Sequence, residues 1–120
     1  APFALTQQLL PLLRLSEDAS VLFATSGVGN YGRAYWGAYC VSKFGIEGFA
    51  QILADELGDT RIRVNCINPG GTRTKMRHAA YPTEDPGTLP PPETITGPYL
   101  YLLGPDSQGT TRKRINIKSD

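Results

Sequence analysis

The sequence predicts an α/β protein built around a parallel sheet, and two observations support this fold class. The first is the succession of a short strand, a long helix and a second strand across residues 20–67. Two strands joined in this way lie parallel in one sheet in nearly all cases. The second is that a turn containing polar residues and glycine follows each strand directly. Such turns lie at the carboxyl ends of the strands, where parallel sheets bind ligands.

The first two thirds of the chain contain the clearest elements. Leucine and phenylalanine recur at helical spacing over residues 1–15, where Pro11 is expected either to kink the helix or to mark its last turns. Ser20–Thr25 is expected to be a strand, because its Val-Leu-Phe-Ala run is typical of a strand covered on both faces. A long apolar pattern then predicts a helix over Gly37–Leu57, and Arg61–Ile67 predicts the next strand.

The last third is less regular. Thr72–Pro92 is rich in proline and poor in apolar residues, which predicts a long surface loop that covers the substrate. Pro92–Leu103 is expected to be a helix, with proline at its start. Thr111–Ile117 is a candidate last strand, although the three successive cations at its centre would be awkward in a buried position. The register of the chain after Ser107 therefore stays open.

Composition limits the classes of function. The 120 residues are 40% hydrophobic and 19% charged, as expected of one soluble globular domain. A net charge of +1 gives no electrostatic reason to expect nucleic acid or a membrane surface as a partner. The two cysteines, Cys40 and Cys66, lack metal-ligand spacing, so we expect two buried thiols in a reducing compartment and no metal site. These features favour a cytoplasmic protein.

Three side chains suggest a catalytic site. Tyr39 and Lys43 are four residues apart, which places them on one face of the predicted helix. Ser26 stands at the end of the preceding strand, thirteen residues before Tyr39. A free tyrosine has a pKa of about 10, and a nearby cation favours the phenolate. A serine hydroxyl can hold a substrate oxygen, so the trio suits proton transfer at an alcohol or carbonyl oxygen while another group moves the hydride.

A second pattern is a weaker candidate. Gly27, Gly29 and Gly32 have the spacing Gly-x-Gly-x-x-Gly after a strand, which is found in dinucleotide phosphate turns. In such turns the helix opens within the motif, but here the helix is expected only from Gly37. An acidic residue should also end the following strand, and Asn68 stands there instead. We therefore interpret this segment as a flexible wall of the site.

These residues resemble the short-chain dehydrogenase/reductase family. That family has a serine followed by Tyr-x-x-x-Lys, matched here by Ser26 and Tyr39-Cys-Val-Ser-Lys43. It also has a strand ending in Asn-Pro-Gly with a threonine shortly after, matched by the segment from Asn68 to Thr72. The likeness covers residues 1–107. The runs WGAYCVSKF, RVNCINPGGTRTKMR and PTEDP are most similar to one bacterial subgroup of the family.

The resemblance implies a doubly wound, Rossmann-like parallel sheet. Members of the family are roughly twice as long as this chain. Residues 1–120 are therefore expected to form the C-terminal half of a single domain, without its phosphate-binding half, and to be inactive alone. The family uses NAD or NADP. By resemblance, Tyr39 and Lys43 contact this cofactor, as does the turn that carries Pro69, Gly70, Thr72 and Thr74.

By this interpretation the expected function is that of an NAD(P)-dependent oxidoreductase that interconverts a small-molecule alcohol and a carbonyl. Tyr39 is the acid and base, Lys43 assists it, and Ser26 and Tyr39 bind the substrate. The alternative is a non-catalytic binding or structural member that keeps the trio by descent. Both long helices, 1–15 and 37–57, are apolar on more faces than one sheet can cover, so we also expect a homo-oligomer formed through them.

Two further groups of residues allow two interpretations each. Tyr31, Tyr35 and Trp36 precede the long helix and either line a substrate pocket or serve in packing. Arg73, Lys75 and Arg77 lie in the predicted loop and either contact a cofactor phosphate or acidic substrate, or are solvated.

Overall fold

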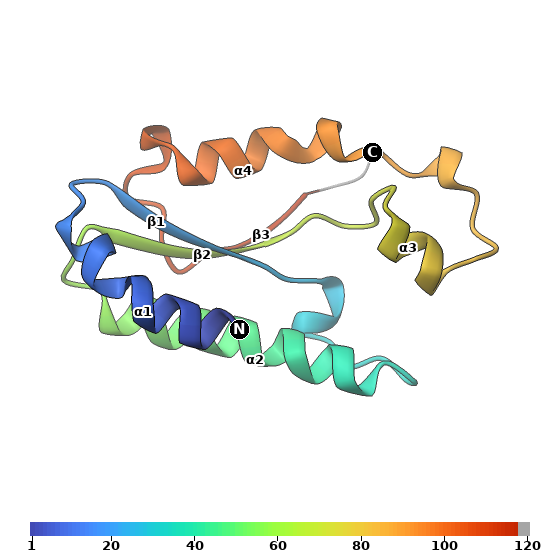
Figure 1. The fold of residues 1–120 in the computed structure, drawn as a ribbon, viewed down its shortest axis with the longest axis horizontal. Coiled ribbons are helices and arrows are strands. Elements are labelled where there is room, and N and C mark those ends of the chain that lie inside the picture. The colour runs from blue at the N-terminus through green and yellow to red at the C-terminus, as the bar shows by residue number, and fades with distance from the viewer. Residues whose placement is uncertain (118–120) are drawn as a thin grey trace.

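The structure is a computed structural model that describes residues 1–117, and it has three layers (Figure 1). A parallel sheet with the strand order β1-β2-β3 forms the middle layer. The helices α1 (Pro2–Leu15) and α2 (Gly37–Glu56) cover one face of the sheet, and α4 (Thr96–Leu103) covers the other. Helices on both faces of a parallel sheet are the doubly wound arrangement that was expected. Residues 118–120 of the predicted domain lie outside the described part.

The strands are close to their predicted positions. They are β1 (Ala19–Ala24), β2 (Ile62–Asn68) and β3 (Arg114–Asn116). Every residue of β2 except the last is buried, as expected of a central strand covered on both faces. Cys66 pairs with Arg114, which sets the register of β3 that the sequence left open. The third strand is shorter than predicted, and it is paired on one side only within the described residues.

The main core lies between the sheet and the helices α1 and α2. The ring centre of Phe49 lies 5.2 Å from that of Phe3 and 5.5 Å from that of Phe23, so one aromatic side chain joins both helices to β1. The buried residues of this core are Ala19, Phe23, Ala50, Leu53, Ala54, Leu57, Ile62, Val64 and Cys66. Their burial fixes α2 across the sheet and therefore fixes where its first turns lie.

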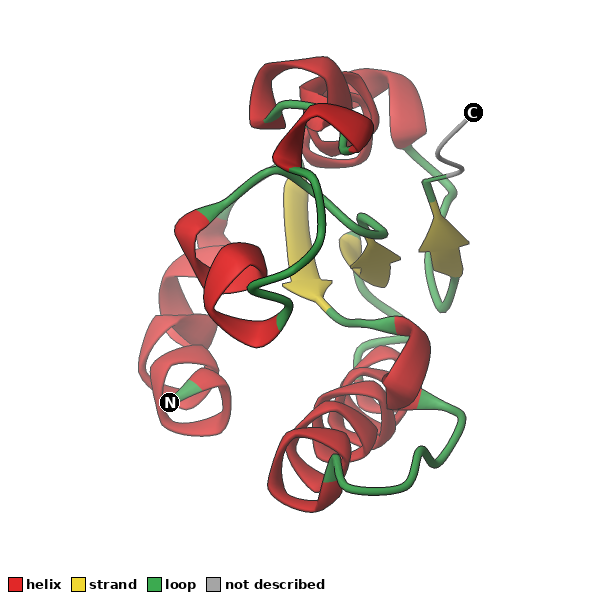
Figure 2. Ribbon diagram, turned by 90° about the vertical axis from the view of Figure 1, so that its right-hand side faces the viewer, coloured by secondary structure: helices red, strands yellow, loops and turns green. Residues whose placement is uncertain are grey.

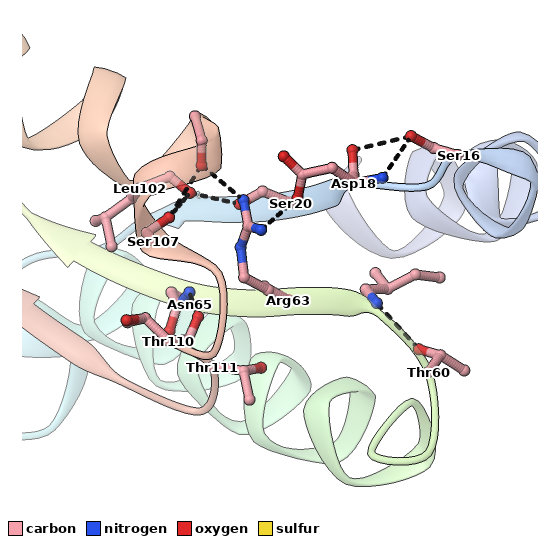
Figure 3. Close-up of polar contacts among 12 residues, drawn as sticks. Ser16, Asp18, Ser20, Thr60, Arg63, Asn65, Leu102, Ser107, Thr110 and Thr111 are labelled. Atoms are coloured by element: carbon pink, nitrogen blue, oxygen red, sulfur yellow. Dashed lines mark hydrogen bonds and ion pairs between the residues drawn. The ribbon is translucent and has the colours of Figure 1, made fainter.

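A buried arginine joins α4 to the edge of the sheet at which the strands begin (Figure 3). Arg63 is 4% exposed, pairs with Asp18 and donates a hydrogen bond of 3.0 Å to the carbonyl oxygen of Gly104. The hydroxyl of Ser20 donates to the carbonyl oxygen of Leu102 at 2.7 Å. A cavity of about 330 Å³ opens beside Asp18 and Arg63. This cavity lies at the edge opposite to the predicted catalytic residues.

The structure adds one element to the surface loop predicted over Thr72–Pro92, because this segment contains the short helix α3 (Lys75–Ala80). The hydroxyl oxygen of Thr74 accepts a hydrogen bond from the amide of Arg77 at 3.1 Å and so caps the helix. No residue of α3 is buried. The segment therefore has no apolar periodicity from which a helix could be predicted.

The remaining helices agree with expectation in type and differ in detail. Pro11 lies inside α1, in its last turns. The predicted helix over Pro92–Leu103 begins as a 3-10 turn at Pro92–Ile95 and becomes α-helical only in α4. Within residues 1–117, no helix is both long and apolar enough to span a bilayer.

Candidate active site

The candidate active site lies at the edge of the sheet where the strands end, which faces the viewer in Figure 2. Ser26 follows β1, and its hydroxyl oxygen accepts a hydrogen bond from the amide of Val28 at 3.4 Å. This contact caps a 3-10 turn over Gly27–Gly29. Tyr39 and Lys43 lie in the first two turns of α2, and both are partly buried. The structure places the three predicted side chains at one edge of the sheet, and their catalytic roles stay a prediction.

The side chain of Lys43 is fixed at the end of β1. Its ammonium nitrogen donates a hydrogen bond of 3.2 Å to the carbonyl oxygen of Ala24. The same nitrogen lies 5.6 Å from the centre of the Tyr39 ring. An ammonium group has three N–H bonds, and the bond to Ala24 uses one of them. The cation is therefore held beside the phenol with donors left for a ligand.

Aromatic side chains connect the site to the segment that follows α3. The Trp36 ring meets the Tyr39 ring edge-on, with 5.8 Å between ring centres, and its centre lies 5.9 Å from that of Tyr81. Arg33 lies over the Trp36 ring at 4.9 Å and donates a hydrogen bond of 3.3 Å to the Tyr81 hydroxyl. This contact between residues far apart in sequence was not predicted. Of the three aromatics before α2, Tyr35 is fully exposed and only Trp36 contacts Tyr39.

The predicted cofactor turn is ordered by its own side chains. Asn68 ends β2, and its amide oxygen accepts a hydrogen bond from the backbone amide of Gly70 at 3.1 Å. Gly70 has a φ of 74°, a conformation that favours glycine. The hydroxyl of Thr72 donates to the carbonyl oxygen of Gly70 at 3.3 Å. The turn therefore exposes backbone at the carboxyl end of β2, between Pro69 and Thr72.

Two arginines in the segment Thr72–Pro92 form their hydrogen bonds with other residues of that segment. Arg73 donates to the carbonyl oxygens of Pro86 and Leu89 at 2.9 and 3.1 Å. The guanidinium of Arg77 makes a two-pronged pair with Glu84, with both distances 2.8 Å, and this hydrogen bonding lowers the pKa of the Glu84 carboxyl. Both arginines therefore bind within the segment, contacts that the sequence did not predict, although Arg73 is exposed, as in the solvated interpretation.

The glycine-rich segment is not a phosphate turn. It contains only a 3-10 turn, and the α-helix α2 begins at Gly37, beyond the motif. The expectation of a flexible wall also needs correction. Gly29 is buried, and a Cβ atom there would lie 2.2 Å from a carboxylate oxygen of Glu47 and 2.3 Å from the hydroxyl oxygen of Thr25. Val28 and Gly29 are therefore packed closely, whereas a Cβ atom at Gly27 or Gly32 would meet nothing within 4 Å.

Glu47 is the residue near the site that the sequence analysis missed. It is buried, and one carboxylate oxygen accepts hydrogen bonds from the Thr25 hydroxyl at 2.6 Å and from Nε of Arg114 at 2.9 Å. Thr25 directly follows β1, and Arg114 begins β3. Glutamate at the fourth position after Lys43 is unremarkable on a helix, so only the folded chain reveals the contact.

Both cysteines are free and buried, as expected. The Cys40 thiol donates to the carbonyl oxygen of Val28 at 3.3 Å. Burial, together with the negative charge of Glu47 and opposed by Arg114, raises the pKa of the Cys66 thiol to about 11. Residues 1–117 contain no group of three histidine, cysteine, aspartate or glutamate side chains placed to hold a metal ion.

Comparison with known proteins identifies the class of protein. A family model described as short chain dehydrogenase matches residues 1–85. This chain therefore belongs to the short-chain dehydrogenase family. The bacterial subgroup that its sequence resembles is the YciK type: the chain is 58% identical to the uncharacterized oxidoreductase YciK of Escherichia coli K12 over 111 residues, which are 92% of this chain and 44% of that protein.

Solved structures agree with this assignment. A short chain dehydrogenase from Shigella flexneri, solved in complex with NADP, matches with a TM-score of 0.92 at 55% identity and covers 95% of this chain and 47% of its own. A short chain dehydrogenase from Pseudomonas syringae matches with a TM-score of 0.92 at 59% identity, over the same shares of the two chains. The chain spans about half the length of the relatives that it matches.

Proposed function

We propose that this chain is the C-terminal part of a single Rossmann-like domain, and that the complete protein is an NAD(P)-dependent oxidoreductase that interconverts an alcohol and a carbonyl. One observation supports this most directly: the Lys43 ammonium group is fixed 5.6 Å from the Tyr39 ring, at the carboxyl edge of a parallel sheet. Ser26 stands at the same edge, two residues after the end of β1. A phenol, a cation and a hydroxyl are the groups needed to exchange a proton with a substrate oxygen.

The proposed chemistry divides the work between these side chains. Ser26 donates a hydrogen bond to the substrate oxygen and orients it toward Tyr39. The Tyr39 phenol gives its proton to that oxygen in reduction and receives it in oxidation. Lys43 stabilises the phenolate that remains, because a cation close to a phenolate lowers its free energy. The nicotinamide cofactor, when bound, supplies or accepts the hydride.

The carboxyl edge fits such a cofactor. The Lys43 ammonium has N–H bonds beyond the one it donates to Ala24, and these suit ribose hydroxyls. Gly70 presents backbone without a side chain. The hydroxyls of Thr72 and Thr74 lie just beyond it, and the Thr74 oxygen already caps α3. We therefore assign Tyr39, Lys43, Pro69, Gly70, Thr72 and Thr74 to cofactor binding. Because the Shigella relative was solved with NADP, NADP is the first cofactor to test.

We assign the substrate side of the site to the segment from Thr72 to Pro92. Tyr81 brings this segment onto Trp36, and Trp36 contacts Tyr39. A carbonyl carbon next to Tyr39 would therefore meet aromatic rings. This supports a small substrate with an apolar or aromatic group beside its carbonyl.

We further propose a homo-oligomer formed through α1 and α2, in the cytoplasm. The outer faces of both helices remain apolar: Phe3, Leu12, Val41 and Ile52 are 63%, 65%, 73% and 58% exposed. Such patches are found where another subunit packs. Two free buried thiols agree with a reducing compartment. A Val41→Asp variant of the complete protein should lower the mass measured by light scattering, and a monomeric parent protein would contradict the proposal.

The test of the proposed function is cofactor binding by the complete protein. NADPH and NADH should each be titrated while the cofactor fluorescence and the melting temperature are followed. We expect saturable binding of at least one, with a melting temperature that rises with its concentration. If neither binds, the alternative of a non-catalytic member is favoured instead.

A further inference from the structure

A buried carboxylate lies directly beneath the end of β1. Glu47 is 6% exposed, and its Oε1 atom accepts hydrogen bonds from the Thr25 hydroxyl at 2.6 Å and from Nε of Arg114 at 2.9 Å. A buried charge is costly unless it is paired and hydrogen-bonded, and this one is both. Because Glu47 belongs to α2, its two contacts join the helix that carries Tyr39 to β3 and to the residue that follows β1.

The guanidinium of Arg114 reaches the serine as well. Its Nη2 atom donates a hydrogen bond of 2.8 Å to the carbonyl oxygen of Ser26. The amide of Gly29 donates to the same oxygen at 2.9 Å. A guanidinium is planar, with several N–H donors in a fixed arrangement, so it can hold a carboxylate and a carbonyl at once. A lysine ammonium, a single compact charge, cannot reproduce this geometry.

Three consecutive residues are thus held by three charged side chains. The carbonyl oxygen of Ala24 accepts a hydrogen bond from Lys43, and the Thr25 hydroxyl donates one to Glu47. The carbonyl oxygen of Ser26 accepts one from Arg114. Lys43 and Glu47 lie one turn apart on α2, whereas Arg114 comes from β3. The backbone that leads into Ser26 is therefore held by side chains from both α2 and β3.

We propose that Glu47 and Arg114 are positioning residues that hold Ser26 at its working distance from Tyr39. The proposal rests on the function proposed above. Neither residue needs to touch the substrate, because both act through the serine backbone and the helix. Small displacements of a catalytic group can lower turnover by about 100-fold, so such contacts are significant for the rate.

The kinetic test replaces Arg114 by lysine in the complete protein. NADPH oxidation should be followed with a panel of small aromatic aldehydes and ketones. We expect Arg114→Lys to lower kcat by about 10- to 100-fold while the dissociation constant for NADPH stays within about twofold. Arg112→Lys is the matched control, because Arg112 pairs with Asp55 at the exposed surface and should leave kcat unchanged.

A double variant distinguishes an effect through Ser26 from a general disturbance of the fold. If Arg114 acts through Ser26, then Arg114→Lys should lower kcat much less in a Ser26→Ala background than in the parent protein. An equal loss in both backgrounds, or wild-type kcat for Arg114→Lys, overturns the inference. Loss of turnover by Tyr39→Phe shows separately that the proposed function holds.

A measurement independent of turnover uses hydrogen exchange. The amide of Gly29 shares its acceptor with Arg114, so Arg114→Lys should speed exchange in residues 27–31 by about tenfold or more, while the centre of β2 keeps its protection. Arg112→Lys should leave residues 27–31 unchanged. Unchanged protection there in Arg114→Lys contradicts the inference, even if no aldehyde or ketone of the panel is reduced.

Discussion

The ammonium nitrogen of Lys43 lies 5.6 Å from the centre of the Tyr39 ring, one helical turn away on α2. The position of this nitrogen is fixed, because it also donates a hydrogen bond of 3.2 Å to the carbonyl oxygen of Ala24. The backbone of β1 therefore determines where the cation stands. The proposed proton transfer depends on this arrangement more than on any other.

Removing that cation should impair both proposed tasks of Lys43. We expect Lys43→Met to lower kcat by about 100-fold or more and to weaken NADPH binding, because the phenolate and the ribose hydroxyls lose the same partner. Steady-state kinetics and a fluorescence titration of the complete protein check this. Lys75→Met, at the exposed start of α3, is the matched control. Unchanged NADPH affinity in Lys43→Met would remove the lysine from the cofactor site.

Gly27 and Gly29, two positions apart in the same segment, should respond differently to alanine. A Cβ atom at Gly29 would lie 2.2 Å from Oε1 of Glu47, whereas at Gly27 it meets nothing within 4 Å. We expect Gly29→Ala to lower the free energy of unfolding by about 1–3 kcal/mol, as overpacking does, and to slow turnover. Gly27→Ala should do neither. Urea unfolding of both variants of the complete protein measures this difference. Equal free energies of unfolding for the two variants would show that Gly29 is not closely packed.

The contact between Trp36 and Tyr81 should affect the substrate and leave the cofactor alone. We expect Tyr81→Ala to raise KM for an aromatic aldehyde by about tenfold, because one ring of the proposed pocket is lost, with NADPH affinity unchanged. Tyr101→Ala is the comparison, since Tyr101 is 51% exposed on α4. If Tyr81→Ala weakens NADPH binding instead, the segment after α3 covers the cofactor rather than the substrate.

Cys66 should make the stability of the protein depend on pH in the alkaline range. Its pKa is raised to about 11, chiefly by burial, whereas a thiol in the unfolded chain has a pKa of about 8.5. A group whose pKa is higher in the folded state stabilises fully below the unfolded value, and this stabilisation is lost as the pH rises toward the folded value. The free energy of unfolding should therefore fall between about pH 8.5 and 11.

Urea unfolding of the complete protein across that range checks the prediction. A Cys66→Ala variant should show a smaller decline, because it has no thiolate to favour the unfolded chain. The two slopes should differ most near pH 10, and parallel slopes would contradict the raised pKa.

The elements with strong local patterns could be predicted from the sequence. The apolar periodicity of residues 37–57 and the buried run at 61–67 led to α2 and β2 within one residue at most boundaries. Turn residues placed Ser26 and the segment from Asn68 to Gly70 at the carboxyl edge. The family resemblance gave Tyr39 and Lys43 their proposed roles, and the periodicity put them on a helix.

The rest depends on contacts between distant residues. Glu47 and Arg114 are 67 residues apart, and neither has a neighbour in sequence that indicates the pair. The three successive cations 112–114 were expected to be awkward in a strand. Only Arg114 lies within β3, where it pairs with Glu47, whereas Arg112 precedes the strand and pairs with Asp55 at the surface. The helix α3 was missed because it buries nothing.

The central claim is that Tyr39 transfers the proton, and a single variant tests it most directly. Turnover and NADPH affinity of the complete protein should be measured for Tyr39→Phe, which removes one hydroxyl and keeps the ring that packs on Trp36. We predict that kcat falls by about 100-fold or more while NADPH still binds with nearly unchanged affinity. Turnover at the wild-type rate by Tyr39→Phe would contradict the account.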